Sequence, residues 1–280
     1  MKSPIRPKSS RGGPKPQASK APTSHRTRSS DHADQRELLY YGVHMCEALS
    51  RVRRDAIIRV YCTDQTSRAL GPLLKWCAQR KKAYHLVTEA ELERITGSVH
   101  HEGVAILALV PEPWSEEELL AALKLRAAPL LVLDGVQNPH NIGTIMRVMA
   151  NFSWPFLVGG SDLPNLTAAG ARMSEGGAEF VKLVRCQNLP RLIGALKRSS
   201  YRILGTSSHA EASLYTHQLP ERTAFILGSE VHGMSQEMEK LLDETLVIPG
   251  SGQVESLNVA VASGLLLGEY TRVYGLLGEQ

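Results

Sequence analysis

Hydrophobic residues along the 280-residue chain alternate between short continuous runs and longer stretches with helical spacing. Between residues 35 and 111, the short runs predict strands at 57–61, 84–87 and 104–110, and the helical spacing predicts helices at 67–81 and 89–95. Strands that alternate with helices over a segment of this length are typical of a small α/β/α domain.

A break in the pattern follows this first domain. Pro111, Pro113 and Trp114 interrupt the alternation, and Ser115 with Glu118 three residues later is typical of a capping box that starts a short helix. We therefore expect residues 112–127 to link two domains.

The alternation resumes at residue 128 and continues to residue 280. Strands are predicted at 130–133, 156–158, 181–184, 202–206, 224–227 and 246–248, with helices at 142–152, 168–175, 189–198 and 235–242 and a final helix at 257–270. Apolar strands separated by helices predict a parallel sheet covered on both faces, so the fold class is α/β. Neither a G-x-G-x-x-G after the first strand nor a P-loop is present, which argues against a dinucleotide or ATP site at the usual place.

Residues 1–34 differ in composition from the rest of the chain. Residues 1–30 hold eight Lys or Arg, five Pro and seven Ser and no acidic residue, whereas the remainder holds 24 basic and 28 acidic side chains. Such a segment buries too little apolar surface to fold, so we expect a disordered basic tail. Its charge favours contact with phosphate backbones, although a solubilising extension has the same composition.

Cysteine usage and hydropathy predict a cytoplasmic protein. The four cysteines show neither CxxC spacing nor histidine pairing at zinc spacing, so we expect buried thiols in a reducing compartment and no metal site. No apolar run reaches the roughly 18 residues that suggest a membrane span, and the N-terminus lacks the apolar core of a secretory signal.

Three polar phrases follow the strands that end at Leu133, Leu227 and Ile248, where open α/β sheets bind ligands. The phrase after Ile248 runs through a Pro-Gly-Ser-Gly turn into the final helix and contains Ser256 and Asn258. One interpretation is structural: Ser256 caps the helix and Asn258 pairs with a neighbouring backbone group. The other is that both side chains face a ligand.

The phrase after Leu133 leads into a helix that carries an unusual arginine. Asn141 stands where an N-cap belongs, and Arg147 points away from the apolar stripe that begins at Ile142. Gly143 lies four residues before Arg147 on the same side, so we expect the guanidinium to be open for phosphate or ribose contact. The alternative is an ordinary surface arginine.

The phrase after Leu227 reads Gly228-Ser-Glu230-Val-His-Gly233-Met-Ser235. Gly228 ends an apolar strand, where a ligand can approach the backbone. Glu230 falls in the loop, and Ser235 is expected to cap the next helix. By itself, Glu230 is also explained as a carboxylate near the start of a helix.

Together the three phrases are similar to the ordered motifs of the SpoU family of RNA 2′-O-ribose methyltransferases, of the TrmH and RlmB type, in the SPOUT superfamily. The resemblance covers the chain from about residue 35 to its end. Three positions depart from the family pattern: Asn138 replaces a common Asp, Gly250 a common Met and Ala260 a common Ser.

The resemblance implies a trefoil-knotted methyltransferase domain over residues 128–280. It implies S-adenosylmethionine held by backbone around Gly228, Ile248 and Leu257, and methyl transfer to a ribose 2′-hydroxyl in rRNA or tRNA. It also implies a catalytic set, namely Arg147, Asn141, Glu230, Ser256 and Asn258. Because arginine is almost never neutral in proteins, we expect Arg147 to stabilise charge rather than to act as a general base.

Two phrases in residues 35–111 resemble the auxiliary domain of the same family. They are Tyr41-Gly-Val-His44 followed by Glu47-Ala-Leu, and His101-Glu-Gly-Val-Ala105. The resemblance implies a ribosomal-protein-like domain that binds the RNA substrate, although turn glycines and locally bonded histidines would give the same residues. Arg51, Arg53 and Arg54 are candidate phosphate contacts, or a solvated helix end favoured by the helix dipole.

We therefore expect an S-adenosylmethionine-dependent RNA 2′-O-ribose methyltransferase. The alternative is a non-catalytic RNA-binding or ribosome-assembly protein that keeps the fold, and a methyltransferase for proteins or small molecules is a third option. We also expect a homodimer, because the final helix is apolar in several directions, at Val259, Val261, Leu265, Leu266 and Leu267. The alternative is that the first domain covers this helix.

Overall fold

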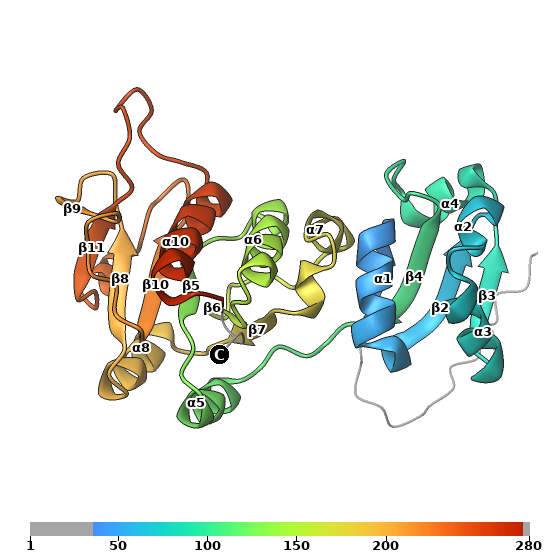
Figure 1. Cartoon of the computed structure of the whole chain (residues 1–280), viewed down its shortest axis with the longest axis horizontal. Coiled ribbons are helices and arrows are strands. Elements are labelled where there is room, and N and C mark those ends of the chain that lie inside the picture. Colours follow the sequence, from blue (N-terminus) through green and yellow to red (C-terminus); the bar gives the residue numbers. More distant parts are fainter. Residues whose placement is uncertain (1–35, 277–280) are drawn as a thin grey trace, which may run out of the picture. The chain divides into compact units, whose positions relative to one another are not determined.

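The computed structural model describes residues 36–276 (Figure 1). The disordered basic tail expected at residues 1–34 lies outside the described residues. No helix between residues 36 and 276 is long and apolar enough to cross a membrane.

The first domain is built on a four-stranded sheet in the order β1-β4-β2-β3 (Figure 1). Strand β4 pairs antiparallel with both β1 and β2, and β3 pairs parallel with β2. Its elements are β1 (Glu37–Tyr41), α1 (Val43–Val52), η1 (Arg54–Ala56), β2 (Ile57–Cys62), α2 (Asp64–Ser67), α3 (Gly71–Gln79), β3 (Ala83–Leu86), α4 (Glu89–Thr96) and β4 (Val104–Leu109).

Helices cover both faces of this sheet, as the pattern predicts. Helices α1 and α3 pack on one face around Met45, Leu49 and Val60, and α4 packs on the other through Leu92. The helix expected at 67–81 is the shorter α3, because Pro72 lies in its first turn and fixes its start there, and the separate helix α2 comes before it. Strand β1 was not predicted.

The second domain is built on a seven-stranded sheet in the order β7-β6-β5-β10-β8-β11-β9, with every pair parallel. The elements are α5 (Glu116–Leu125), β5 (Leu130–Asp134), α6 (Pro139–Asn151), β6 (Phe156–Gly159), α7 (Ala168–Met173), η2 (Gly177–Glu179), β7 (Lys182–Arg185), α8 (Leu189–Arg198), β8 (Arg202–Thr206), β9 (Ala212–Ser213), β10 (Thr223–Gly228), α9 (Gln236–Glu239), β11 (Glu244–Val247) and α10 (Val259–Tyr274). The predicted parallel α/β sheet is confirmed, and only the short β9 was missed.

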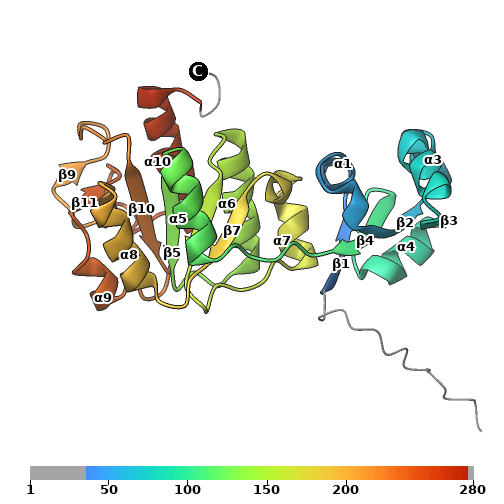
Figure 2. The same cartoon turned by 90° about the horizontal axis from the view of Figure 1, so that it is seen from below.

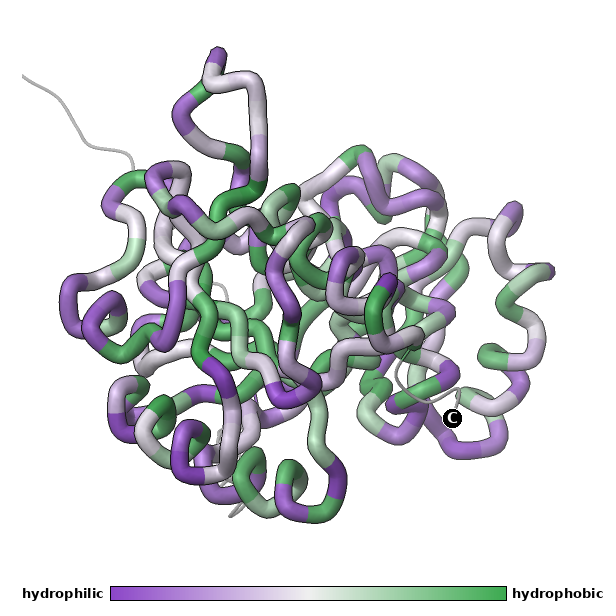
Figure 3. The backbone as a smooth tube through the Cα atoms, turned by 60° about the vertical axis from the view of Figure 1, so that its left-hand side comes forward, coloured by the Kyte–Doolittle hydropathy of each residue, from purple (hydrophilic) through white to green (hydrophobic). Residues whose placement is uncertain are grey.

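Helices lie on both faces of this sheet (Figure 2). Alternate residues of its strands contribute to two separate cores. Leu131, Phe225 and Leu246 face α6 and α10, whereas Leu130 and Ile226 face α5, α8 and α9. Hydrophobic residues are accordingly frequent in the interior segments of the chain, and hydrophilic residues in its outer turns (Figure 3). This layering leaves the carboxyl ends of the strands as the place where polar side chains can gather.

The segment expected to be a linker contains part of this second core. The capping box is present, since the Ser115 side chain accepts from Glu118 N and the Glu118 side chain accepts from Ser115 N. Leu119 is completely buried, and Trp114 forms a bridge with Val184 of β7. Residues 114–125 are therefore part of the second domain, because the amphipathic helix that starts there covers its sheet.

Candidate active site

The three polar phrases meet at one edge of the second sheet. Strand β10 lies between β5 and β8, and β11 lies on the other side of β8. Gly228 at the end of β10 is paired with Asp134 at the end of β5. Because all these strands are parallel, the segments that follow them leave the sheet on the same side.

A hydrogen-bond network joins one residue from each phrase. Glu230 Oε1 accepts from Asn258 Nδ2 at 2.6 Å, from Asn141 Nδ2 at 3.2 Å and from the backbone N–H of Val259 at 3.3 Å. Asn258 Nδ2 also donates to Asn141 Oδ1 at 3.0 Å. One carboxylate therefore fixes the first turn of α6 and the start of α10 to the loop after β10.

The caps of the two helices differ from those expected. Asn258, not Ser256, is the N-cap of α10, and its Oδ1 accepts from Ala260 N at 3.0 Å. Asn138, not Asn141, is the N-cap of α6, and its Oδ1 accepts from His140 N at 3.0 Å. Because Pro139 can occupy the first helical turn without a lost hydrogen bond, α6 starts early enough to turn Asn141 inward toward Glu230.

The turn that carries Glu230 is closed tightly on Gly228. Ser229 and Gly233 exchange two backbone hydrogen bonds, each of 2.9 Å. A Cβ on Gly228 would lie 2.2 Å from the carbonyl carbon of Gly233, which leaves no room for a side chain. Asp134 Oδ2 supports the turn from the next strand by accepting from Ser235 N at 2.7 Å. Sequence reasoning missed Asp134, although its position at the end of a strand beside Gly228 was the available signal.

A long exposed loop connects β11 to α10 and projects from the sheet in Figure 1. Residues 251–258 are all exposed, and Ile248 at the start of the loop is half-buried. Within residues 36–276, no backbone N–H from Gly250 to Leu257 donates to another backbone group. The N–H of Gln253 donates to Ser251 Oγ at 3.4 Å. The other N–H groups of the loop, together with the apolar side chains of Ile248 and Leu257 at its two ends, fit a ligand with a flat heterocycle and polar edges.

Arg147 lies on the same helix as Asn141 but leaves it in another direction. Six residues separate the two, which corresponds to about 240° around a helix. The Arg147 side chain is exposed, and Asn141 is buried. Among the hydrogen bonds of the described chain, neither Arg147 nor Ser256 contributes a side chain to the network around Glu230.

The expectation that Gly143 leaves an open space below Arg147 is wrong. A Cβ on Gly143 would lie 2.1 Å from the carbonyl oxygen of Gly170, so this glycine allows α7 to approach α6 closely. A Cβ on Gly177 would lie 2.8 Å from the Cα of Arg147 itself. The backbone of the arginine is therefore held by α7 and η2, while its guanidinium remains exposed.

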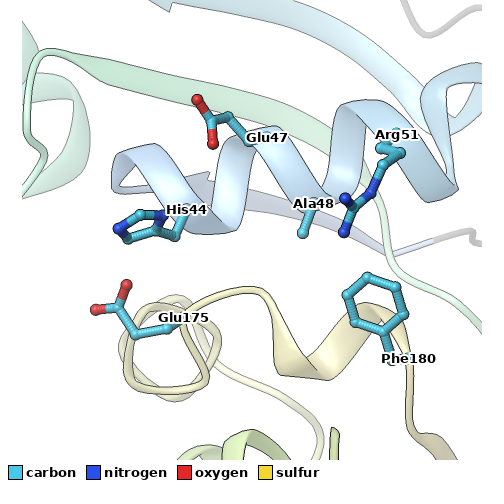
Figure 4. A pocket seen from close by; sticks show the side chains of 6 residues that line it. All are labelled: His44, Glu47, Ala48, Arg51, Glu175 and Phe180. Carbon is cyan, nitrogen blue, oxygen red and sulfur yellow. The ribbon is translucent and has the colours of Figure 1, made fainter. Parts of the chain in front are cut away.

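The three arginines expected to contact phosphate have different surroundings. Arg51 lies over the ring of Phe180 at 5.4 Å and lines a pocket of about 330 Å³ with His44, Glu47, Ala48 and Glu175 (Figure 4). Arg54 lies over the ring of Trp76 at 5.8 Å. Both guanidinium groups remain accessible to an anion from one side.

Arg53 is engaged inside the protein. Its Nε and Nη2 donate to the two oxygens of Glu179 at 2.6 and 2.8 Å, and its Nη1 donates to the carbonyl of Leu109 at 2.7 Å. Burial by itself lowers the pKa of Arg53, but the hydrogen bonds and charge of Glu179 outweigh it and raise the pKa. Sequence reasoning missed Glu179, because its partner lies 126 positions away in the chain.

Arg53→Ala is expected to destabilise the folded protein by about 3 kcal/mol, because the side chain of Glu179 is only 2% exposed and would lose its counterion. The measurement is the free energy of unfolding in urea. Arg54→Ala, at the neighbouring exposed arginine, is the control and should cost less than about 1 kcal/mol. The double variant Arg53→Met/Glu179→Leu should recover most of the loss, and a double variant as unstable as Arg53→Ala would contradict this explanation.

Among the described residues, no group of three or more His, Cys, Asp or Glu side chains is arranged to hold a metal ion. The four cysteines are buried and unpaired. Burial raises the pKa of Cys46 well above its ordinary range, and that of Cys186 to about 12. Both thiols are therefore protonated at neutral pH and are inert packing groups.

Two helix starts, a glycine-closed turn and an exposed loop lie together at the carboxyl ends of the parallel strands. This arrangement is typical of α/β enzyme domains that bind a nucleotide cofactor. Residues 128–268 match the model of the SpoU rRNA Methylase family, and residues 39–114 match the model described as RNA 2′-O ribose methyltransferase substrate binding. The chain belongs to the SpoU rRNA methylase family, which confirms the resemblance seen in its three polar phrases.

Relatives with known names match this chain across both of its domains. The chain is 32% identical, over 84% of its length and 68% of the relative, to the uncharacterized tRNA/rRNA methyltransferase YfiF of Escherichia coli O157:H7. It is 30% identical, over 84% of its length and 98% of the relative, to the 23S rRNA (guanosine-2′-O-)-methyltransferase RlmB of Salmonella typhimurium LT2.

Solved structures share the fold. The SpoU methyltransferase AviRb from Streptomyces viridochromogenes, in complex with AdoMet, superposes with a TM-score of 0.71 at 20% identity, over 85% of this chain and 90% of that one. A putative RNA methyltransferase of the TrmH family from Porphyromonas gingivalis gives a TM-score of 0.67 at 24% identity, over 85% and 90% of the two chains.

Proposed function

We propose that this protein transfers a methyl group from S-adenosylmethionine to a ribose 2′-hydroxyl of ribosomal RNA. The observation that carries the proposal is the network in which Glu230 binds Asn141 and Asn258, since it unites the three phrases that resemble the family's motifs. The relatives that match both domains are named as methyltransferases, so the non-catalytic alternative is not favoured.

The residues present fit S-adenosylmethionine as the methyl donor. Gly228 allows the backbone turn to close without a side chain, and the loop from Ile248 to Leu257 offers free N–H groups beside apolar side chains. When bound, the cofactor supplies an electrophilic methyl group. The chain's own residues would hold it through backbone at these three positions. The AviRb structure, which shares the fold, contains AdoMet.

Arg147 would bind the RNA that accepts the methyl group. Its exposed guanidinium can bind an RNA phosphate next to the reacting ribose and stabilise negative charge that develops on the 2′-oxygen. Asn141, Glu230 and Asn258 would keep the starts of α6 and α10 in place, and Ser256, exposed in the loop, is available for a polar contact with the substrate. Arg51 and Arg54 remain candidate phosphate contacts.

Ribosomal RNA is favoured over tRNA as the substrate. The 23S rRNA methyltransferases named RlmB match this chain over 96 to 98% of their own length, and the match to this chain includes its substrate-binding domain. The test is methylation of rRNA from a strain that lacks this gene, with full-length protein and S-adenosylmethionine. A 2′-O-methyl group blocks alkaline cleavage at its nucleotide, so we expect one new protected position. Protection of tRNA alone would show that tRNA, not rRNA, is the substrate. No protection with intact cofactor binding would favour the non-catalytic alternative.

We also propose a homodimer, although a smaller part of the final helix is exposed than the sequence suggested. Val259, Leu266 and Leu267 are buried within the chain, whereas Val261 is 52% exposed and Leu265 is half-buried one turn later. The first domain packs on α7 and η2 rather than on α10, so it does not cover this stripe. An isologous contact of two α10 helices would bury it. Sedimentation velocity should give a dimer, and Val261→Asp should weaken it; a wild-type monomer at micromolar concentration would end the proposal.

The trefoil knot and the cytoplasmic location are part of the same proposal. The solved structures that share the fold are SpoU and TrmH enzymes, and the loop from β11 to α10 is long enough to pass another segment. A knot would shorten the fully stretched chain in a single-molecule pulling experiment, and a full contour length would exclude it. The cytoplasm agrees with four buried, unpaired cysteines and an rRNA substrate.

A further inference from the structure

An aromatic pair lies on the exposed edge of the first domain, on strands β2 and β3. Tyr61 on β2 and His85 on β3 are cross-strand partners. Their rings are stacked, with centroids 5.5 Å apart and an interplanar angle of 22°. Strand β3 is the last strand of the sheet, and all four of its residues are exposed.

Positive charge lies beside this pair, toward the start of β3. Arg59 lies two residues before Tyr61 on the same face of β2, is exposed, and donates from Nη1 to the Tyr61 hydroxyl at 3.3 Å. Its partner across the strands is Ala83, whose small side chain leaves the guanidinium uncovered. The chain enters β3 through three consecutive cations, Arg80, Lys81 and Lys82. The basic turn therefore adjoins Arg59 at the start of the edge strand.

Helix α4 covers the middle of this face but leaves the edge strand exposed. Its one buried residue, Leu92, clusters with Tyr41 and Ala105, and Tyr61 packs against the same cluster. His85, beyond Tyr61 on β3, is exposed. Leu39 and Leu107, in the middle of the same face, are only half-buried. A sheet face that carries stacked aromatic rings, with cations along its edge, combines the two features that bind unpaired nucleic acid: base stacking and phosphate neutralisation.

We propose that Arg59, Tyr61 and His85, together with the basic turn 80–82, bind an unpaired segment of the RNA substrate. A base stacks on the exposed His85 ring, which Tyr61 supports from β2, and the flanking phosphates lie against Arg59 and the turn. This inference rests on the proposed function and gives the substrate-binding domain a second RNA contact, since Arg53 is held by Glu179. A duplex is a poorer fit, because its bases cannot reach an aromatic face.

A purely structural role would have different consequences. Stacked cross-strand pairs also stabilise sheet edges. Such a role predicts a lower unfolding temperature for His85→Ala with unchanged RNA affinity in the folded protein. Tyr84 provides a matched control, because it is on the same strand, is 43% exposed and points to the other face of the sheet. Lys75, exposed on α3, is the control for Arg59.

The experiment measures binding of full-length protein to a fluorescent oligouridylate of about 12 nucleotides, a length that several stacked bases require. His85→Ala should weaken binding by at least about fivefold, the loss typical of one stacked base. Arg59→Ala should lower the slope of log affinity against log salt by about 0.7, as expected for one phosphate contact on a single strand. Tyr84→Ala and Lys75→Ala should bind like wild type, and His85→Phe should retain affinity.

Unchanged oligouridylate affinity in both His85→Ala and Arg59→Ala would overturn the inference. Equal weakening by His85→Ala and Tyr84→Ala would assign the loss to the strand rather than to the stacked ring, and would also overturn it. Binding of S-adenosylmethionine should be the same in every variant. Failure of wild-type protein to methylate RNA would instead count against the proposed function, which keeps the two failures apart.

Discussion

Replacement of Arg147 with alanine is expected to lower the rate of methyl transfer by about 10²- to 10³-fold while S-adenosylmethionine still binds. This magnitude is typical of the loss of one group that stabilises developing charge. The backbone at Arg147 is fixed by Gly177 and its side chain is exposed, so the substitution removes the guanidinium without disturbing the packing of α6. Arg191→Ala, at an exposed arginine of α8 on the other layer, is the control and should retain full activity.

The Arg147→Lys variant separates two chemical roles for this residue. Lysine keeps the positive charge but loses the planar pair of donors, so a stabilising role predicts partial activity with an unchanged pH dependence. A general base must be neutral, and lysine becomes neutral near its ordinary pKa of about 10.4. Activity of the lysine variant that rises with pH and reaches the wild-type rate would therefore show that Arg147 acts as a base. The measurement is the pH–rate profile of single-turnover methylation.

Replacement of Gly228 with alanine is expected to abolish detectable cofactor binding. The added Cβ would lie 2.2 Å from Gly233 C and 2.3 Å from Met234 N, and backbone atoms cannot move aside as a flexible side chain can. The turn that carries Glu230 must shift, and the hydrogen bonds from Asn141 and Asn258 go with it. The measurement is calorimetric titration of the variant with S-adenosylmethionine, which should show no binding.

Gly250 offers a matched control in the neighbouring loop. No atom lies within 4 Å of a Cβ built on this residue, so Gly250→Ala should bind the cofactor like wild type. The same open space explains how Gly250 can stand where the family often carries methionine, and Gly250→Met should also fold. Loss of cofactor binding in Gly250→Ala, or its retention in Gly228→Ala, would contradict the assignment of the cofactor site to this edge of the sheet.

Local patterns in the sequence determined much of the second domain. Short apolar runs that alternate with helical patterns are typical of buried parallel strands, so they predicted the sheet. The polar phrases had to follow those strands, because buried strands have no place for them. The types and spacing of Asn141, Glu230 and Asn258 also identified them as a set before their contacts were known, through resemblance to the SpoU motifs.

Only the tertiary structure decided what each of these residues touches. Periodicity reports which side of a helix is buried but not what covers it, so Gly143 was taken as an open space although the backbone of α7 fills it. The caps shifted to Asn138 and Asn258 for a similar reason, because several polar side chains near a helix start can cap it. In α6, Asn138 caps and Asn141 binds Glu230, whereas in α10 Asn258 does both through its two amide atoms. Likewise the sequence gives no reason to separate Arg53 from its neighbours, because its partner Glu179 lies 126 residues away. Tyr61 and His85 contact each other only because β3 pairs with β2 in this register. Hydrogen bonds, ion pairs and ring stacking between distant segments depend on distances of a few ångströms, and the chain acquires those distances only when its sheets and helices pack.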